Sequence, residues 1–170
     1  MRITALASTV IVLQMGAHTA EITTHLEVDG PEIVAAMKTA WAQSLAGMTG
    51  FEATFRLDGN PSDYEVVVLP YTNEYMKQKI EIIPGRTFAV FHVHPCKAEP
   101  APSGQDKKLA HKYGLKIVTI HLRGLYEYDP VTRKTTKLRN GIDWINPVER
   151  AYAAGSPSQY ARSVSQAVGR

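Results

Sequence analysis

The sequence has almost no cysteine and no long apolar run, and these absences exclude several classes of protein at once. Cys96 is the single cysteine among 170 residues, so no disulfide can form within the chain. No stretch reaches the roughly 18 apolar residues that a transmembrane helix requires. Hydrophobic residues make up 44% of the chain and charged residues 21%, which is typical of a globular domain. This composition excludes a collagen, a coiled coil, a disordered tail protein and a disulfide-built scaffold.

The chain also lacks a strong charge of either sign. Lys and Arg number 19 and Asp and Glu 16, which leaves a net charge of +3 and a mildly basic protein. The densest basic stretch, residues 107–116, is typical of a solvated helix face. It contains only one aromatic residue, Tyr113, on which a nucleic-acid base could stack. A basic nucleic-acid-associated module is therefore an alternative only, and we expect no specific nucleic-acid partner.

The amino terminus has some features of a secretory signal peptide. Arg2 is the only charged residue among the first 20, and residues 3–13 are mostly apolar, with small residues after them. The cleavage site is poor, because a cut after Ala20 places His18 at the −3 position. A buried first strand or helix is the alternative interpretation. We expect a signal peptide over 1–20 and one domain over 21–170, which slightly favours a secreted or periplasmic location over a cytoplasmic one.

Hydrophobic periodicity predicts a single mixed α/β (α+β) domain, in which helices flank a central sheet. A helix is expected over 32–46, and its apolar stripe consists of Ile33, Met37, Trp41 and Leu45. A second helix is expected over 103–113, ended by Gly114, and the tail from Asn146 is also expected to be helical. The predicted strands cover residues 51–57, 64–69, 86–93, 117–122, 125–128 and 134–138.

Two histidines lie at the end of the strand predicted over 86–93. Side chains alternate along a strand, so His92 and His94 project to the same side, with Cα atoms about 7 Å apart. Both imidazoles can therefore reach one metal ion. Histidine and carboxylate ligands with an open coordination position are the usual arrangement of a catalytic zinc site. A pair of ordinary surface or core histidines is the alternative interpretation.

Asp106 is the candidate carboxylate ligand. It lies in the first turn of the helix expected over 103–113, on the inward side that Leu109 and Ala110 share. An acid on a buried face needs a partner, and two neutral imidazoles that share a cation with it would provide one. Ser103 and Asp106 also have the spacing of a helix capping box. The two interpretations are compatible, because a capped helix would hold the ligand rigidly.

The segment from His92 to Asp106 resembles the signature of the JAMM family, the MPN-plus (JAB domain) metalloproteases, and especially its bacterial JAB branch. That signature is a distant Glu, then H-x-H-P, then S-x-x-D, and it is matched by His92-Val93-His94-Pro95 and Ser103-Gly104-Gln105-Asp106. The resemblance covers roughly residues 31–128. It departs from the family at one point, because eight residues separate His94 from Ser103 where the family usually has seven.

The resemblance implies a metal site and a reaction. His92, His94 and Asp106 would bind Zn²⁺, and Ser103 would help to stabilise the tetrahedral intermediate. The activity implied is zinc-dependent hydrolysis of a peptide or isopeptide bond. The alternative is a catalytically silent JAMM-like scaffold that works by binding.

The resemblance also implies a general base for the attacking water. Glu52 fits this role by position, because it opens the strand that follows the first helix and lies 40 residues before His92. Glu65 and Glu74 are the rival acids. If the protein is exported, a cell-envelope peptide is the expected substrate. If it stays in the cytosol, a protein tail or a ubiquitin-like conjugate is expected instead.

Overall fold

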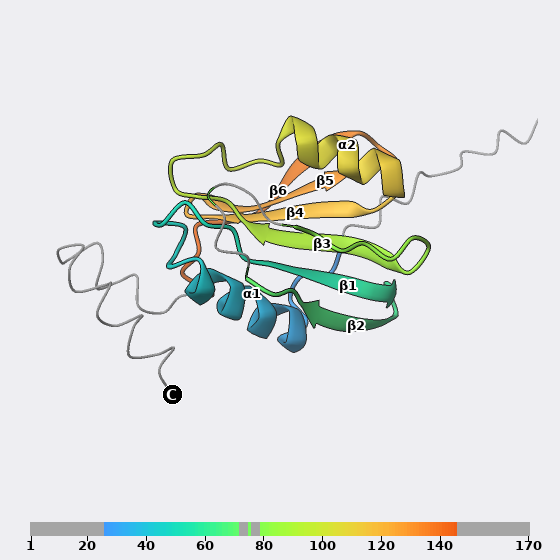
Figure 1. The fold of residues 1–170 in the computed structure, drawn as a ribbon, viewed down its shortest axis with the longest axis horizontal. Coiled ribbons are helices and arrows are strands. Elements are labelled where there is room, and N and C mark those ends of the chain that lie inside the picture. The colour runs from blue at the N-terminus through green and yellow to red at the C-terminus, as the bar shows by residue number, and fades with distance from the viewer. Residues whose placement is uncertain (1–25, 72–74, 76–78, 146–170) are drawn as a thin grey trace, which may run out of the picture.

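A computed structural model describes residues 26–71, 75 and 79–145 of the chain. This part consists of three layers, in which a six-stranded mixed sheet has one helix on each face (Figure 1). The prediction of a mixed α/β domain is therefore confirmed. The predicted signal peptide at 1–20 and the predicted helical tail from Asn146 lie outside the described residues.

The strands are ordered β2-β1-β3-β4-β5-β6 across the sheet. β3 and β4 run parallel, whereas the four other neighbouring pairs in the described sheet are antiparallel. A parallel pair needs a crossover connection, and here that connection contains α2. The elements are α1 Pro31–Gln43, β1 Thr54–Asn60, β2 Asp63–Val68, β3 Thr87–Val93, α2 Gly104–Tyr113, β4 Lys116–His121, β5 Gly124–Asp129 and β6 Lys134–Asn140.

Helix α1 covers one face of the sheet. It begins at a proline with Glu32 in its first turn, and its buried face includes Ile33, Met37 and Trp41, as the stripe predicted. The prediction was wrong for Leu45, which is 41% exposed. The helix ends at Gln43, and Leu45 has a φ of 48°, so its backbone is left-handed and the four-residue repeat no longer applies.

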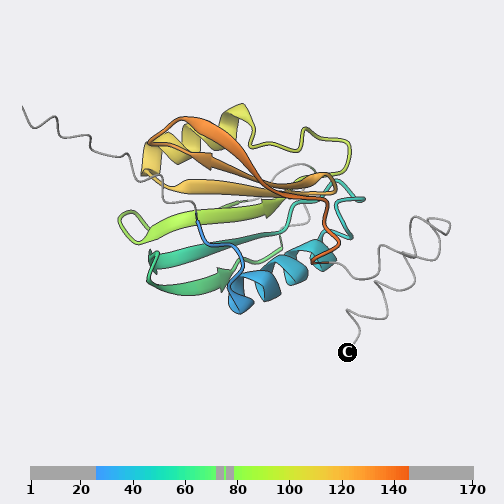
Figure 2. The same ribbon diagram turned by 180° about the vertical axis from the view of Figure 1, so that it is seen from behind.

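The two faces of the sheet carry separate apolar clusters. On the α1 side, the rings of Phe55 and Phe91 stack with their centroids 4.5 Å apart. On the α2 side, Ala110 packs against Val90 and Ile117. Figure 2 shows the same layers from behind. Neither of the two described helices has the length and apolarity that crossing a bilayer requires.

The register of the sheet fixes the place of the histidines. His92 on β3 lies between Thr54 on β1 and Thr119 on β4, in the middle of the sheet. β3 ends at Val93, so His94 lies between the strand and the segment 95–102 that leads to α2. α2 then runs back over β4 and β5 on the face opposite α1. Its first turn lies near the end of β3, because Asp106 Oδ1 is 3.7 Å from His92 Nε2.

Candidate metal centre

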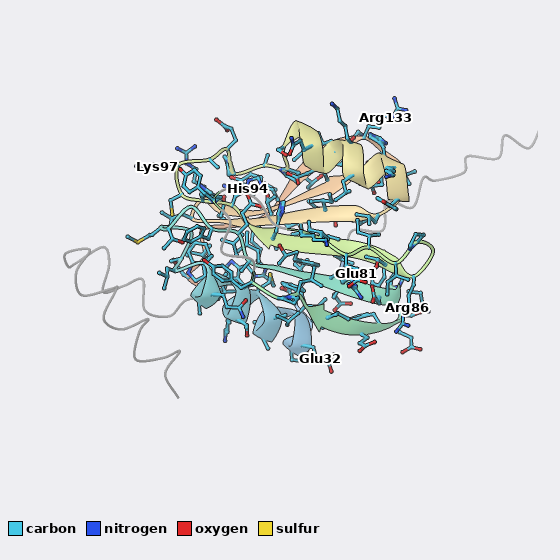
Figure 3. The ribbon with its side chains drawn as sticks, viewed as in Figure 1. Glu32, Glu81, Arg86, His94, Lys97 and Arg133 are labelled. Atoms are coloured by element: carbon cyan, nitrogen blue, oxygen red, sulfur yellow. The ribbon has the colours of Figure 1, made fainter. Side chains whose placement is uncertain are left out.

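The end of β3 and the first turn of α2 bring together His92, His94 and Asp106. One ligand atom from each residue lies within 4.8 Å of the others. His92 Nε2 is 3.7 Å from Asp106 Oδ1, and His94 Nε2 is 3.6 Å from Asp106 Oδ2. Figure 3 labels His94 at the end of β3 and Lys97 on the loop that follows it.

The two nitrogen–oxygen separations in this group are closer to those between ligands of one metal ion than to direct hydrogen bonds. Separations of 3.6–3.7 Å between nitrogen and oxygen are too long for a hydrogen bond. Tetrahedral ligands about 2.0–2.2 Å from one ion lie roughly 3.3–3.6 Å from each other. His92 Nε2 is buried and has no hydrogen-bond partner among the described residues, which is costly unless a cation satisfies it. The buried His-His-Asp group can therefore hold a metal ion.

A backbone carbonyl orients the ring of His94. His94 Nδ1 lies 2.6 Å from the carbonyl oxygen of Glu99. A carbonyl only accepts, so Nδ1 carries the hydrogen and donates it. In the neutral ring the lone pair is then on Nε2, the atom that faces Asp106. Such a contact behind a metal ligand fixes both its tautomer and its orientation.

The capping box predicted from the sequence is present and orients Asp106. The Ser103 backbone N–H donates to Asp106 Oδ2 over 2.6 Å, and the Asp106 backbone N–H donates to Ser103 Oγ over 3.2 Å. Ser103 is the N-cap of α2. The carboxylate is thus fixed to the end of a helix, with its second oxygen still facing His92.

Burial and charge shift the pKa values of all three candidate ligands. Burial lowers the pKa of His92 to about 4, so this ring is neutral near pH 7. Burial also acts against the charged form of His94, but Asp106 and the Glu99 carbonyl outweigh it and raise its pKa. For Asp106, burial is outweighed by His92, His94 and the capping hydrogen bonds, which hold its pKa well below the usual range. A neutral ring and an ionised carboxylate are the forms that bind metal.

Glu52 lies beside this group without belonging to it. Its Oε2 is 3.9 Å from His92 Nδ1, and its side chain is 14% exposed. Burial is the main reason that its pKa is raised. The residue precedes β1 by two positions, instead of opening the strand as predicted. The rival Glu65 is exposed on β2 and paired with Arg86 at 3.0 Å, and the rival Glu74 lies outside the described residues.

A cleft of about 930 Å³ opens over the candidate ligands. Glu52 and Ser103 both line it, so the structure brings all five site residues predicted from the sequence to one place. One wall comes from α2, through Lys108 and Leu109, and another includes Lys79 and Ile80, which precede β3. The second wall was not predicted, because residues 70–85 have no periodicity that indicates what they contact.

Two further polar residues near the centre were also not predicted as part of it. Thr119 and His121 on β4 are buried on the face of the sheet that His92 occupies. Burial lowers the pKa of His121, which keeps this ring neutral. The period-2 pattern of β4 offered a partial signal, because it places Thr119 and His121 on one face of that strand. The pairing of β4 with β3 puts this face beside His92. Cys96 lies outside the ligand group, and its thiol donates to the carbonyl of Ala46.

The chain matches no protein-family model and no curated protein. What this chain can do is therefore inferred from the residues of the site and from their geometry.

Proposed function

We propose that this protein is a zinc-dependent hydrolase of peptide or isopeptide bonds, related to the JAMM metalloproteases. The observation that supports this most directly is the combination of two groups in one cleft. The three-residue ligand group faces the cleft with a buried nitrogen that has no partner among the described residues, and a second acid, Glu52, stands beside it as a non-ligand. An elevated pKa suits a carboxylate that accepts and returns a proton near neutral pH.

The chain's own residues divide the work of the reaction. A bound zinc ion would supply Lewis acidity to the scissile carbonyl and make a water molecule more acidic. His92, His94 and Asp106 hold the ion in place. The Glu52 carboxylate takes a proton from the attacking water and passes it to the leaving amine. The Ser103 hydroxyl, which lines the same cleft, donates a hydrogen bond to the developing oxyanion.

The same two-histidine, one-carboxylate donor set also binds ferrous iron in oxygenases. Glu52 favours hydrolysis, because a hydrolase needs a general base next to the metal. Its distance of 3.9 Å from His92 Nδ1 places it close to the ligands but outside their group. Iron at full occupancy in the purified protein would therefore count against the proposal.

The proposed substrate is a polypeptide segment, because the cleft combines apolar walls with polar groups of both charges. If the protein is exported, the segment belongs to a cell-envelope peptide. If the protein remains in the cytosol, the segment is a protein tail or a ubiquitin-like conjugate. Sequencing the amino terminus of the mature protein distinguishes the two.

Metal analysis is the first test of the proposal. We expect about one zinc per chain in the purified protein. His92→Ala, His94→Ala and Asp106→Ala should each lose most of it. His111→Ala is the matched control, because His111 is exposed on α2 and bonds to the Tyr128 hydroxyl at 2.7 Å, away from the ligand group. Full zinc occupancy in all three ligand variants would refute the site.

The second test measures hydrolysis. Zinc-loaded protein is incubated with a mixture of synthetic peptides, and newly formed amino groups are counted with a fluorescent amine reagent. We expect products from the wild-type protein and none from its Asp106→Ala variant. Equal product from both would assign the cleavage to a contaminant and refute the proposed activity.

A further inference from the structure

The loop that joins the two halves of the candidate metal centre is held from the neighbouring strand. This loop, residues 95–102, runs from His94 to the N-cap of α2. Thr119 on β4 is fully buried, and its hydroxyl donates to the Pro100 carbonyl over 2.6 Å. A buried hydroxyl is stable only when it is hydrogen-bonded, so this contact accounts for a threonine at that position.

His121 provides a second attachment from the same face of β4. Its Nδ1 accepts the backbone N–H of Arg123 at 3.0 Å, so the hydrogen of the neutral ring is on Nε2. That Nε2 lies 3.4 Å from the Cys96 carbonyl, which can only accept. The two attachment points, Cys96 and Pro100, therefore lie on either side of Glu99 in the loop.

Glu99 is the residue whose carbonyl receives the Nδ1–H of His94. Its own side chain is not needed for that contact, so the position of the carbonyl depends on the path of the loop. The path is fixed in part by the hydrogen bonds from β4 to Cys96 and Pro100 and by one turn inside the loop, in which Ala98 N–H donates to the Pro95 carbonyl over 2.8 Å. The Cys96 N–H and thiol also donate to the Gly47 and Ala46 carbonyls on the side of the loop away from β4. A chain of contacts thus runs from β4 through the loop to a candidate metal ligand.

We propose that Thr119 and His121 are positioning residues for the metal centre. By holding the Pro100 and Cys96 carbonyls, they place the Glu99 carbonyl where it fixes His94 in the tautomer with its lone pair on Nε2. This inference rests on the proposed metal-binding function, but the tautomer of His94 can be measured without metal. Neither residue is among those that line the cleft.

Thr119→Val tests the proposal with the least change of shape. The variant keeps the volume of the side chain and removes the hydroxyl donor. Nitrogen NMR of the metal-free protein, recorded at a pH high enough for the His94 ring to be neutral, should show His94 leaving the pure Nδ1–H form. The zinc dissociation constant, measured by chelator competition, should rise about tenfold, the lower end of the range for residues that hold a metal ligand in place. Thr119→Ser keeps the hydroxyl and should restore both values.

Thr87→Val is the matched control. Thr87 is also a buried threonine on the sheet, and its hydroxyl bonds to Asp58 at 2.7 Å and to the Ile83 N–H at 3.0 Å, away from the loop. It should lower stability but leave zinc affinity and the His94 tautomer unchanged. If Thr119→Val yields no folded protein, His121→Leu tests the second attachment in the same way.

The outcomes separate the inference from the proposed function. Unchanged zinc affinity and tautomer in Thr119→Val would overturn the inference while leaving the metal site intact. An equal loss of zinc affinity in Thr87→Val would also overturn it, because the effect would then be general destabilisation. If the wild-type protein binds no zinc, the proposed function fails, and the tautomer decides alone whether these residues position His94.

Discussion

Replacing His92 with leucine should separate metal binding from folding, because this residue is unfavourable to the metal-free fold. Its side chain is 3% exposed, its pKa of about 4 leaves the ring neutral near pH 7, and Nε2 has no hydrogen-bond partner in the described part of the chain. A buried polar group without a partner costs about 1–3 kcal/mol. Replacement of such a group by an apolar one is nearly neutral or stabilising.

The expected magnitude follows from that cost, reduced by the imperfect fit of a leucine in a space shaped for an imidazole. We expect the free energy of unfolding of metal-free His92→Leu to exceed that of wild type by about 0–2 kcal/mol. Zinc at 100 times its dissociation constant should stabilise wild type by about 2.7 kcal/mol and the variant not at all. The loss of metal binding would thus appear without any loss of fold.

The assay is urea unfolding at pH 7 with a chelator and then with zinc, followed by tryptophan fluorescence. Trp41 is buried in the core and reports on unfolding. His121→Leu is the matched control, because both nitrogens of that buried ring have partners, and the substitution removes the acceptor of the Arg123 N–H. Its free energy of unfolding should be about 1–3 kcal/mol lower than that of wild type. An equal loss of stability in metal-free His92→Leu would show that His92 is a structural residue and contradict this prediction.

Three further predictions concern the neighbouring groups. Glu52→Gln should keep its zinc, but its rate of hydrolysis should fall 10²- to 10⁴-fold. Glu65→Gln is the control and should match wild type in both zinc content and rate, which are measured by metal analysis and turnover. Normal turnover in Glu52→Gln would assign the general base to another residue. The pKa of His92 falls from 6.5 to about 4 on folding, so its protonation favours the unfolded chain. As pH drops from 6.5 to 4, the free energy of unfolding of the metal-free wild type should therefore fall by up to about 3 kcal/mol relative to that of His92→Leu. Parallel curves of unfolding free energy against pH for the two proteins would contradict this. Ser103→Gly should lower the free energy of unfolding by only about a few tenths of a kcal/mol, because glycine is tolerated as an N-cap. The same substitution should slow hydrolysis 10²- to 10³-fold. Unchanged turnover would limit the role of Ser103 to capping the helix.

Much of the fold follows from local patterns. The strand over 86–93 and the helix over 103–113 were predicted within about a residue of β3 and α2, because alternation, capping and a stopping glycine are local signals. The end of the first helix was placed too far along, because Leu45 continues the apolar repeat while its left-handed backbone does not continue the helix. The turn that follows the helix contains Gly47, which packs closely against the backbone of a distant segment. A Cβ atom at Gly47 would lie only 2.9 Å from the His94 carbonyl oxygen, so this tertiary contact fixes the turn.

The spacing of residues in the sequence determined which ones can form the metal group. His92 and His94 share a side because strand side chains alternate, and Asp106 is oriented by a capping box complete within four residues. Only the tertiary structure decided which acid stands beside them. Glu52 and Glu65 differ little as local signals, but β1 pairs with β3 and brings Glu52 into the cleft, whereas β2 lies outside β1 and leaves Glu65 exposed. The contacts of Thr119 and His121 with the loop likewise depend on the parallel pairing of β3 and β4, because hydrogen bonds between distant segments leave no periodic trace in a sequence.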